Sequence, residues 1–169
     1  MKRNKKGFTL IELLVVIGII AVLAGVVVVA LNPLERIKES RDSKRLQDIQ
    51  AVRQAVDIAL ADSEVTLGGD ATTHATGNSK TDGVTIASGW VKVTTVTGAT
   101  GFAKYMPLLP QDPQGATTGE SGYAWESDGT DYVLSTSFET NKYDTAYAAT
   151  DGGPDDTLYE TGTKTGLAW

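Results

Sequence analysis

Cysteine is absent from the 169-residue chain, and histidine occurs only once, as His74. Without cysteine the protein has no disulfide bonds, no thiolate zinc sites and no cysteine nucleophiles. A single histidine excludes histidine-rich metal sites and makes any Ser-His-Asp hydrolase depend on His74. That residue lies in a threonine-rich stretch, so we expect it to be a surface histidine rather than a catalytic base.

Acidic and basic side chains are distributed unevenly along the chain. Residues 1–7 carry only basic charges, and residues 8–31 carry one charged side chain, Glu12. Residues 32–62 hold equal numbers of acids and bases, whereas residues 63–169 have a formal charge of −9. Such an acidic body repels phosphate groups, so the sequence argues against nucleic acid as a partner.

The apolar run over residues 8–31 predicts a membrane-spanning helix. At about 1.5 Å per residue this helix would be roughly 36 Å long, and a bilayer core is about 30 Å thick. One segment cannot close a barrel, so only a helix could cross. The basic residues before it predict a cytoplasmic N-terminus and an external body. The run is too long for the apolar part of an ordinary signal peptide.

Glu12 is the one charged residue of this run, and two explanations for it stay open. A carboxylate at the centre of a membrane helix costs roughly 2.5–3.5 kcal/mol, and less near an interface. Glu12 lies five residues into the run, so it could sit at the level of the headgroups. Alternatively, it could meet a cationic partner.

The residues around Glu12 resemble the prepilin processing motif of type IV pilins and type II secretion pseudopilins. The sequence reads Lys-Lys-Gly-Phe-Thr-Leu-Ile-Glu over residues 5–12, followed by the apolar run. The resemblance implies cleavage after Gly7, N-methylation of Phe8 by the same membrane peptidase, and pairing of Glu12 with the terminal amine of a neighbouring subunit. A pair between chains would favour assembly, whereas the same pair within one chain would leave the subunit free.

Helical periodicity resumes after Pro33, where we expect a kink or a melted turn because proline has no N–H. The spacing predicts a helix from Leu34 to Ala61 whose apolar face packs on the body and whose charges are mostly solvated. Basic residues are interleaved with acids here, which weakens a nucleic-acid interpretation. The apolar positions are Leu34, Ile37, Leu46, Ile49, Val52, Val56 and Leu60.

Residues 63–169 contain 15 of the 18 glycines, and the pattern predicts loops and short strands. The fold class is therefore α+β, with a long N-terminal membrane-spanning helix that continues into a globular domain with a small antiparallel sheet, as in type IV pilins. We divide the chain into a leader (1–7), an assembly helix (8–31), an amphipathic half-helix (32–62) and a β-rich head (63–169). Within the head we expect a loop over 66–83, strands over 84–86 and 90–97, and a hairpin of 123–125 with 132–138.

The acidic residues Asp151, Asp155 and Asp156 form a candidate calcium site. Residues 109–113 (Leu-Pro-Gln-Asp-Pro) resemble a stretch of the major pseudopilins. This resemblance implies that acids of the C-terminal loop bind calcium. Calcium takes six to eight oxygen ligands, and carboxylates supply them well. Asp131 and Asp144 are weaker candidates for extra ligands. The alternative is a solvated acidic turn without a metal.

These features favour a structural filament subunit, of a type II secretion pseudopilus or a type IV pilus, that catalyses nothing. The resemblance implies as partners copies of the chain itself, the prepilin peptidase and N-methyltransferase, an inner-membrane platform with its assembly ATPase, and membrane lipid. The protein would be a single-pass inner-membrane protein before joining an extracytoplasmic filament. One alternative is a minor pilin at a filament tip that binds DNA or a surface ligand. A membrane-tethered hydrolase would leave Gly7, Phe8 and Glu12 unexplained.

Overall fold

The computed structural model describes residues 7–69, 75–79, 82, 85, 89–114 and 122–164. Most of the leader, His74, Trp169 and most of the predicted strand 84–86 therefore lie outside the described residues. The chain divides into two compact units, residues 1–37 and 38–169.

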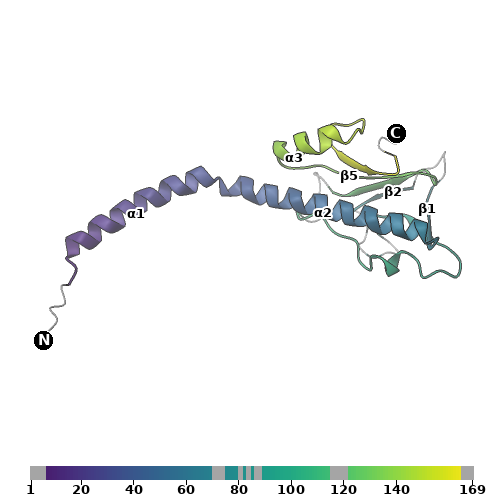
Figure 1. The fold of residues 1–169 in the computed structure, drawn as a ribbon, viewed down its shortest axis with the longest axis horizontal. Coiled ribbons are helices and arrows are strands. Elements are labelled where there is room, and N and C mark those ends of the chain that lie inside the picture. Colours follow the sequence, from purple (N-terminus) through teal and green to yellow (C-terminus); the bar gives the residue numbers. More distant parts are fainter. Residues whose placement is uncertain are drawn as a thin grey trace. The chain divides into compact units, whose positions relative to one another are not determined.

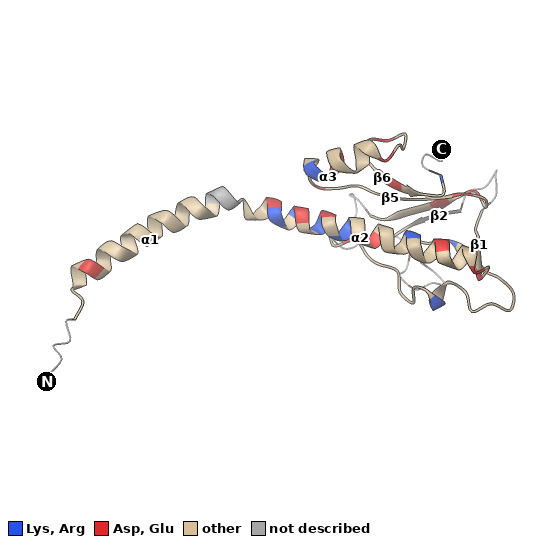
Figure 2. Ribbon diagram, in the orientation of Figure 1, with Lys and Arg blue, Asp and Glu red and all other residues tan. Residues whose placement is uncertain are grey.

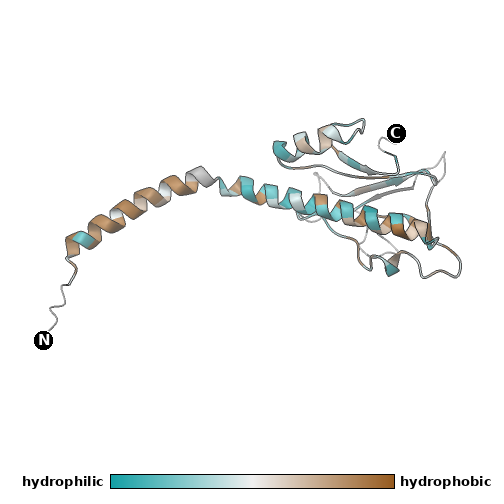
Figure 3. Ribbon diagram, in the orientation of Figure 1, coloured by the Kyte–Doolittle hydropathy of each residue, from teal (hydrophilic) through white to brown (hydrophobic). Residues whose placement is uncertain are grey.

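Helix α1 (Leu10–Leu31) forms the predicted apolar helix. The large apolar side chains between Phe8 and Val28 are all exposed, and Figure 3 shows their hydrophobic colouring along the helix. The stretch Leu10–Val28 is long and apolar enough to cross a membrane. Exposed apolar side chains in this number are unfavourable in water, and lipid or other apolar surfaces would cover them favourably.

The helix breaks where the sequence predicts, between α1 and α2 (Pro33–Ala61). Asn32 adopts the left-handed conformation at a φ of 40°, which ends α1. Pro33 then opens α2, where its missing N–H would have no helical partner anyway. The Asn32 carbonyl accepts hydrogen bonds from the amides of Glu35 and Arg36, so the second helix starts at once.

The head contains two antiparallel sheets beside α2 (Figure 1). Strand β1 pairs with β3, and the larger sheet has the strand order β2-β4-β5-β6. Its short helical segments are η1, α3 and η2. The bounds are β1 Val65–Leu67, β2 Ala75–Asn78, β3 Val93–Thr95, η1 Phe102–Lys104, β4 Ala124–Ser127, β5 Tyr132–Thr136, α3 Asn141–Ala146, η2 Ala148–Thr150 and β6 Tyr159–Gly162.

The hydrophobic core of the head lies between α2 and the larger sheet, as predicted, but Leu34 and Ile37, which were expected on the packed face of the helix, are exposed. Ile49, Val52 and Val56 of α2 are fully buried in one cluster with Trp125 of β4 and Leu134 of β5. Trp125 stacks on Tyr132, with ring centroids 4.9 Å apart. The helix and the hairpin therefore stabilise each other by burying one shared apolar surface.

The predicted hairpin is confirmed, whereas the predicted loop over 66–83 is wrong in part. Strands β4 and β5 pair with Trp125 opposite Leu134, and the Asp128 carboxylate accepts hydrogen bonds from two amides of the turn. Residues 65–67 and 75–78, however, form β1 and β2. Their partners, β3 and β4, lie far along the chain. The local composition, rich in glycine and threonine, therefore did not predict β1 and β2.

Candidate functional site

The junction between Gly7 and Phe8 precedes the first helical turn and is accessible. Both residues are exposed, Phe8 to 89%, and α1 begins only at Leu10. A Cβ atom placed on Gly7 would have no other atom within 4 Å. A peptidase could therefore reach the Gly7 carbonyl without unwinding a helix.

Glu12 and Thr9 form a capping box at the start of α1. The backbone amide of Thr9 donates to Glu12 Oε2 at 2.9 Å, and the Thr9 hydroxyl donates to the same oxygen at 2.7 Å. The Glu12 amide donates in return to the Thr9 hydroxyl at 3.3 Å. The role of Thr9 was missed from the sequence, although the spacing Thr-x-x-Glu is a known helix-start signal.

The capping box adds an explanation for Glu12 that the sequence did not suggest, because the carboxylate has a hydrogen-bond partner within its own chain. That partner is the Thr9 backbone and hydroxyl, and both bonds lie at the exposed end of the helix. Glu12 is the acidic residue in the first turn of α1, and Figure 2 shows one acidic band near the start of that helix. A cation that approached this end would find the carboxylate already held in one position.

A second charged cluster lies inside the head around Arg45 of α2. The Arg45 side chain is fully buried, and its Nε lies 2.7 Å from an Asp112 oxygen. Its Nη1 lies 2.8 Å from both Asp42 and Glu139. Burial opposes the charge on Arg45, but its hydrogen bonds to Asp112 and the neighbouring carboxylates outweigh this and raise its pKa.

The same cluster ties the segment after β5 to α2. Asp42 accepts hydrogen bonds from the amides of Glu139 and Thr140 and from the Thr140 hydroxyl. Arg41 pairs with Glu139 as well, and this pairing lowers the pKa of the Glu139 carboxyl. The prediction of mostly solvated charges is thus wrong for Asp42, Arg45 and the likewise buried Asp48. Their role in the head is structural.

The three acids of the predicted calcium site are engaged in turns of the backbone or exposed. Asp151 accepts from the amides of Gly153 at 2.8 Å and Glu160 at 2.5 Å. Asp155 accepts from the Thr157 amide and hydroxyl, which lowers its pKa, and Asp156 is exposed. Within the described part of the chain, no three His, Cys, Asp or Glu residues gather closely enough to hold a metal ion.

Glu160, a residue that the sequence did not suggest, lies beside Asp151. Its side chain is only 8% exposed, and its buried Oε2 has no hydrogen-bond partner among the described residues. Burial raises the pKa of Glu160, and the negative charges of Asp151 and Asp155 raise it further. A Cβ on Gly153 would lie 1.9 Å from this oxygen, so glycine is what leaves room for it.

Comparison with known families gives one result. The model described as the prokaryotic N-terminal methylation motif matches residues 2–28, which include Gly7, Phe8, Glu12 and most of α1. No curated protein and no solved structure matches the chain. The match supports a type IV pilin-like prepilin, processed by a prepilin peptidase, and it agrees with the α+β layout of the structure.

Proposed function

We propose that this protein is a structural subunit of a type II secretion pseudopilus, processed at Gly7–Phe8 and polymerised through α1. The observation that carries the proposal is the methylation motif on a helix whose large apolar side chains are exposed from Leu10 to Val28. An uncovered apolar helix needs lipid before assembly and other helices after it. The protein catalyses nothing in this scheme.

Glu12 would change partners when the subunit leaves the membrane. In the single chain its carboxylate is held by Thr9, which lowers the cost of keeping it in the bilayer. Cleavage after Gly7 exposes a cationic amine on Phe8, and the Phe8 amine of a neighbouring subunit offers a stronger, charge-assisted bond. Each subunit would supply one acid and one amine, so the pairing would extend along a filament.

The remaining partners follow from the same proposal. The basic leader holds the N-terminus in the cytoplasm, and the head lies outside the inner membrane. A platform protein and a cytoplasmic ATPase would supply the work of extraction. The head, in which Arg45 is paired internally with three carboxylates, would form the surface of the filament.

Three features favour the secretion pseudopilus over an adhesion or motility pilus. The chain lacks the cysteines that close the C-terminal region of many pilins. Residues 109–113 resemble the corresponding stretch of major pseudopilins, and Asp112 within it binds Arg45. The C-terminal region is acidic.

We also propose a structural calcium ion in this acidic region, with a different ligand set from the predicted one. Because the described residues bring no three acids together, two carboxylates and several backbone carbonyls would have to hold it. Asp151 and Glu160 lie together, and the unpartnered Glu160 oxygen is a ligand for which the fold provides no other use. Asp155 adds charge nearby, while backbone carbonyls would complete the coordination. The exposed Asp156 has no contact that supports a role as a ligand.

Intact mass measurement of the membrane-extracted protein tests the proposed function. We expect loss of residues 1–7 and the addition of one methyl group on Phe8. The Gly7→Val variant should stay full-length, because a branched side chain blocks the close approach that the peptidase needs. A mature chain that begins after Asn32, or one that keeps Met1 in a host with the peptidase, would overturn the proposal.

A further inference from the structure

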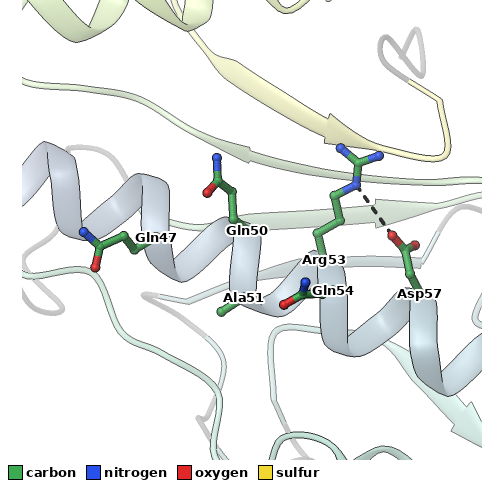
Figure 4. A pocket seen from close by; sticks show the side chains of 6 residues that line it. All are labelled: Gln47, Gln50, Ala51, Arg53, Gln54 and Asp57. Atoms are coloured by element: carbon green, nitrogen blue, oxygen red, sulfur yellow. Dashed lines mark ion pairs between the residues drawn. The ribbon is translucent and has the colours of Figure 1, made fainter.

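The outward face of α2 carries a stripe without acidic or basic side chains. Gln47, Ala51, Gln54 and Ile58 are exposed and follow one another at spacings of four, three and four residues. The exposed charges of this half of the helix, such as Arg53 and Asp57, lie to one side (Figure 4). The surface of a solvated helix is usually rich in charge, whereas the centre of a protein interface is depleted in it.

The stripe borders a hollow of about 450 Å³ in the surface of the head. Four of the six residues that line it, Gln47, Gln50, Ala51 and Gln54, offer neutral amides and a methyl group. The other two, Arg53 and Asp57, have opposite charges and lie 3.6 Å apart, and Arg53 also donates to Thr161 of β6. The hollow therefore suits a neutral, partly apolar occupant.

A second charge-free surface lies on the segment 105–111. Leu108 is 63% exposed, and with Ile58 at 48% it is one of two exposed large aliphatic side chains in the described part of the head. Prolines at 107 and 110 flank it. Buried Leu109 and a hydrogen bond from the Trp90 indole to the Pro110 carbonyl fix the segment. Leu108 is thus presented on a rigid support, so its burial would cost little conformational entropy.

Charge decides which surfaces of two heads can meet. The region 63–169 has a formal charge of −9, so most contacts between two copies would place like charges together. The α2 stripe and the Leu108 segment avoid this. They lie on different elements of the head, and a contact between two different patches repeats without closing, which is what a filament requires.

We propose that the α2 stripe of one subunit receives the Leu108 segment of the next, so that Ile58 and Leu108 are buried together. This inference rests on the proposed filament function and names the contact between heads, in addition to the helix α1. It commits to a second copy of this chain as the occupant of the hollow.

Disulfide trapping tests the contact cleanly because the natural chain has no cysteine. Two single variants, Ile58→Cys and Leu108→Cys, are produced together in one host, carrying different tags, and mild oxidant is added to assembled filaments. A disulfide forms only where the two Cα atoms lie within about 7 Å. We expect a dimer that carries both tags and little of either single-tag dimer.

The matched control replaces Ile58→Cys by Lys142→Cys, an exposed position on α3 away from the stripe. A mixed dimer no stronger than this control, or a dimer formed mainly between two Ile58→Cys chains, would overturn the head contact. In either case filaments would still be present, so the proposed function would stand. If even the cysteine-free parent forms no filaments, the proposed function fails and the contact fails with it.

A charge placed on the stripe gives an independent readout. Gln54→Glu should lower the filament yield roughly fivefold or more, because it adds an acid to the contact between two acidic heads. Processing at Gly7–Phe8 should be unchanged. Asn141→Asp adds the same single negative charge at an exposed position on α3 and should leave the yield within about twofold of the parent. Equal yields from the two variants would count against the contact.

Discussion

The charges of α1 and of the head meet opposite environments. Glu12 is the only charged side chain in the described part of α1, and it lies at the start of a helix whose large apolar side chains from Leu10 to Val28 are exposed. Arg45 is fully buried in the head, surrounded by Asp42, Asp112 and Glu139. The Glu12 carboxylate is therefore accessible to another molecule, whereas the Arg45 guanidinium is fully paired within the head.

This difference indicates that α1 determines assembly and that the interior of the head determines stability. The head buries its apolar residues and pairs its interior charges, so it has the contacts of an independently folded unit. The described side chains of α1 are exposed, and its one charged residue, Glu12, is held by the capping box with Thr9. We therefore expect variants in α1 to change assembly without unfolding the head, and variants in the head interior to do the reverse.

The largest expected effect is the loss of assembly in Glu12→Ala. The variant should insert normally, because it removes a charge from lipid. Filament yield should fall at least roughly tenfold, the change that follows from losing only about 1.4 kcal/mol per subunit contact. Sheared-filament assays at matched subunit levels measure this, and thermal unfolding of the head should be unaltered.

Thr9→Val is the matched control for Glu12→Ala. It removes the hydroxyl that holds Glu12 but keeps the carboxylate, so assembly should change much less than in Glu12→Ala. A normal filament yield from Glu12→Ala would show that assembly does not depend on the pair between Glu12 and the Phe8 amine. An equal loss in both variants would assign the effect to helix capping instead.

The second effect is on stability, and Arg45→Ala should show it. Removing the arginine leaves three carboxylates without their buried cation, which typically costs about 3–5 kcal/mol. Urea unfolding of the detergent-solubilised protein measures the change. Arg53→Ala is the control on the same helix, because its partly exposed pair with Asp57 should be worth less than about 1 kcal/mol. Equal costs for the two variants would contradict the comparison between buried and exposed charge.

Much of the fold could be predicted because its strongest signals are local. The apolar run predicted α1, the spacing of apolar residues by three and four positions predicted α2, and Pro33 marked the break between them. The hairpin followed from alternating apolar residues around a Ser-Asp-Gly-Thr turn. In each case a helix or a hairpin depends on residues near in sequence.

The remainder depends on partners that are distant in sequence. Strands β1 and β2 form only because β3 and β4 lie beside them, and β6 pairs with β5 without any apolar alternation of its own. Arg45 looked like a solvated helix charge because Asp112, its partner, is 67 residues away. For the same reason Glu160 was not recognised beside Asp151, while Asp156 was favoured on sequence proximity alone.

Calcium is expected to have a smaller effect than Arg45→Ala. An ion that binds only the folded head adds RT ln(1 + [L]/Kd), about 2.7 kcal/mol at a hundredfold excess over Kd. The solubilised protein should therefore melt several degrees higher in calcium than in chelator. Glu160→Gln should abolish the difference, whereas Asp156→Asn should keep it. Identical melting of the parent protein in both buffers would leave these acids as a metal-free cluster.

The smallest expected effect concerns Glu126 on β4, whose pKa is raised by burial to about 7. A carboxyl with a raised folded-state pKa binds its proton more tightly in the folded protein. It therefore destabilises the head progressively as the pH rises from about 4.5, where the unfolded group titrates, to about 7. Glu126→Gln removes this penalty and should stabilise the head by about 1–2 kcal/mol at pH 8, since partial exposure reduces the full effect. At pH 4 the variant and the parent should unfold at nearly the same urea concentration. A gain that is equal at both pH values would show that packing, and not the charge on Glu126, distinguishes the two proteins.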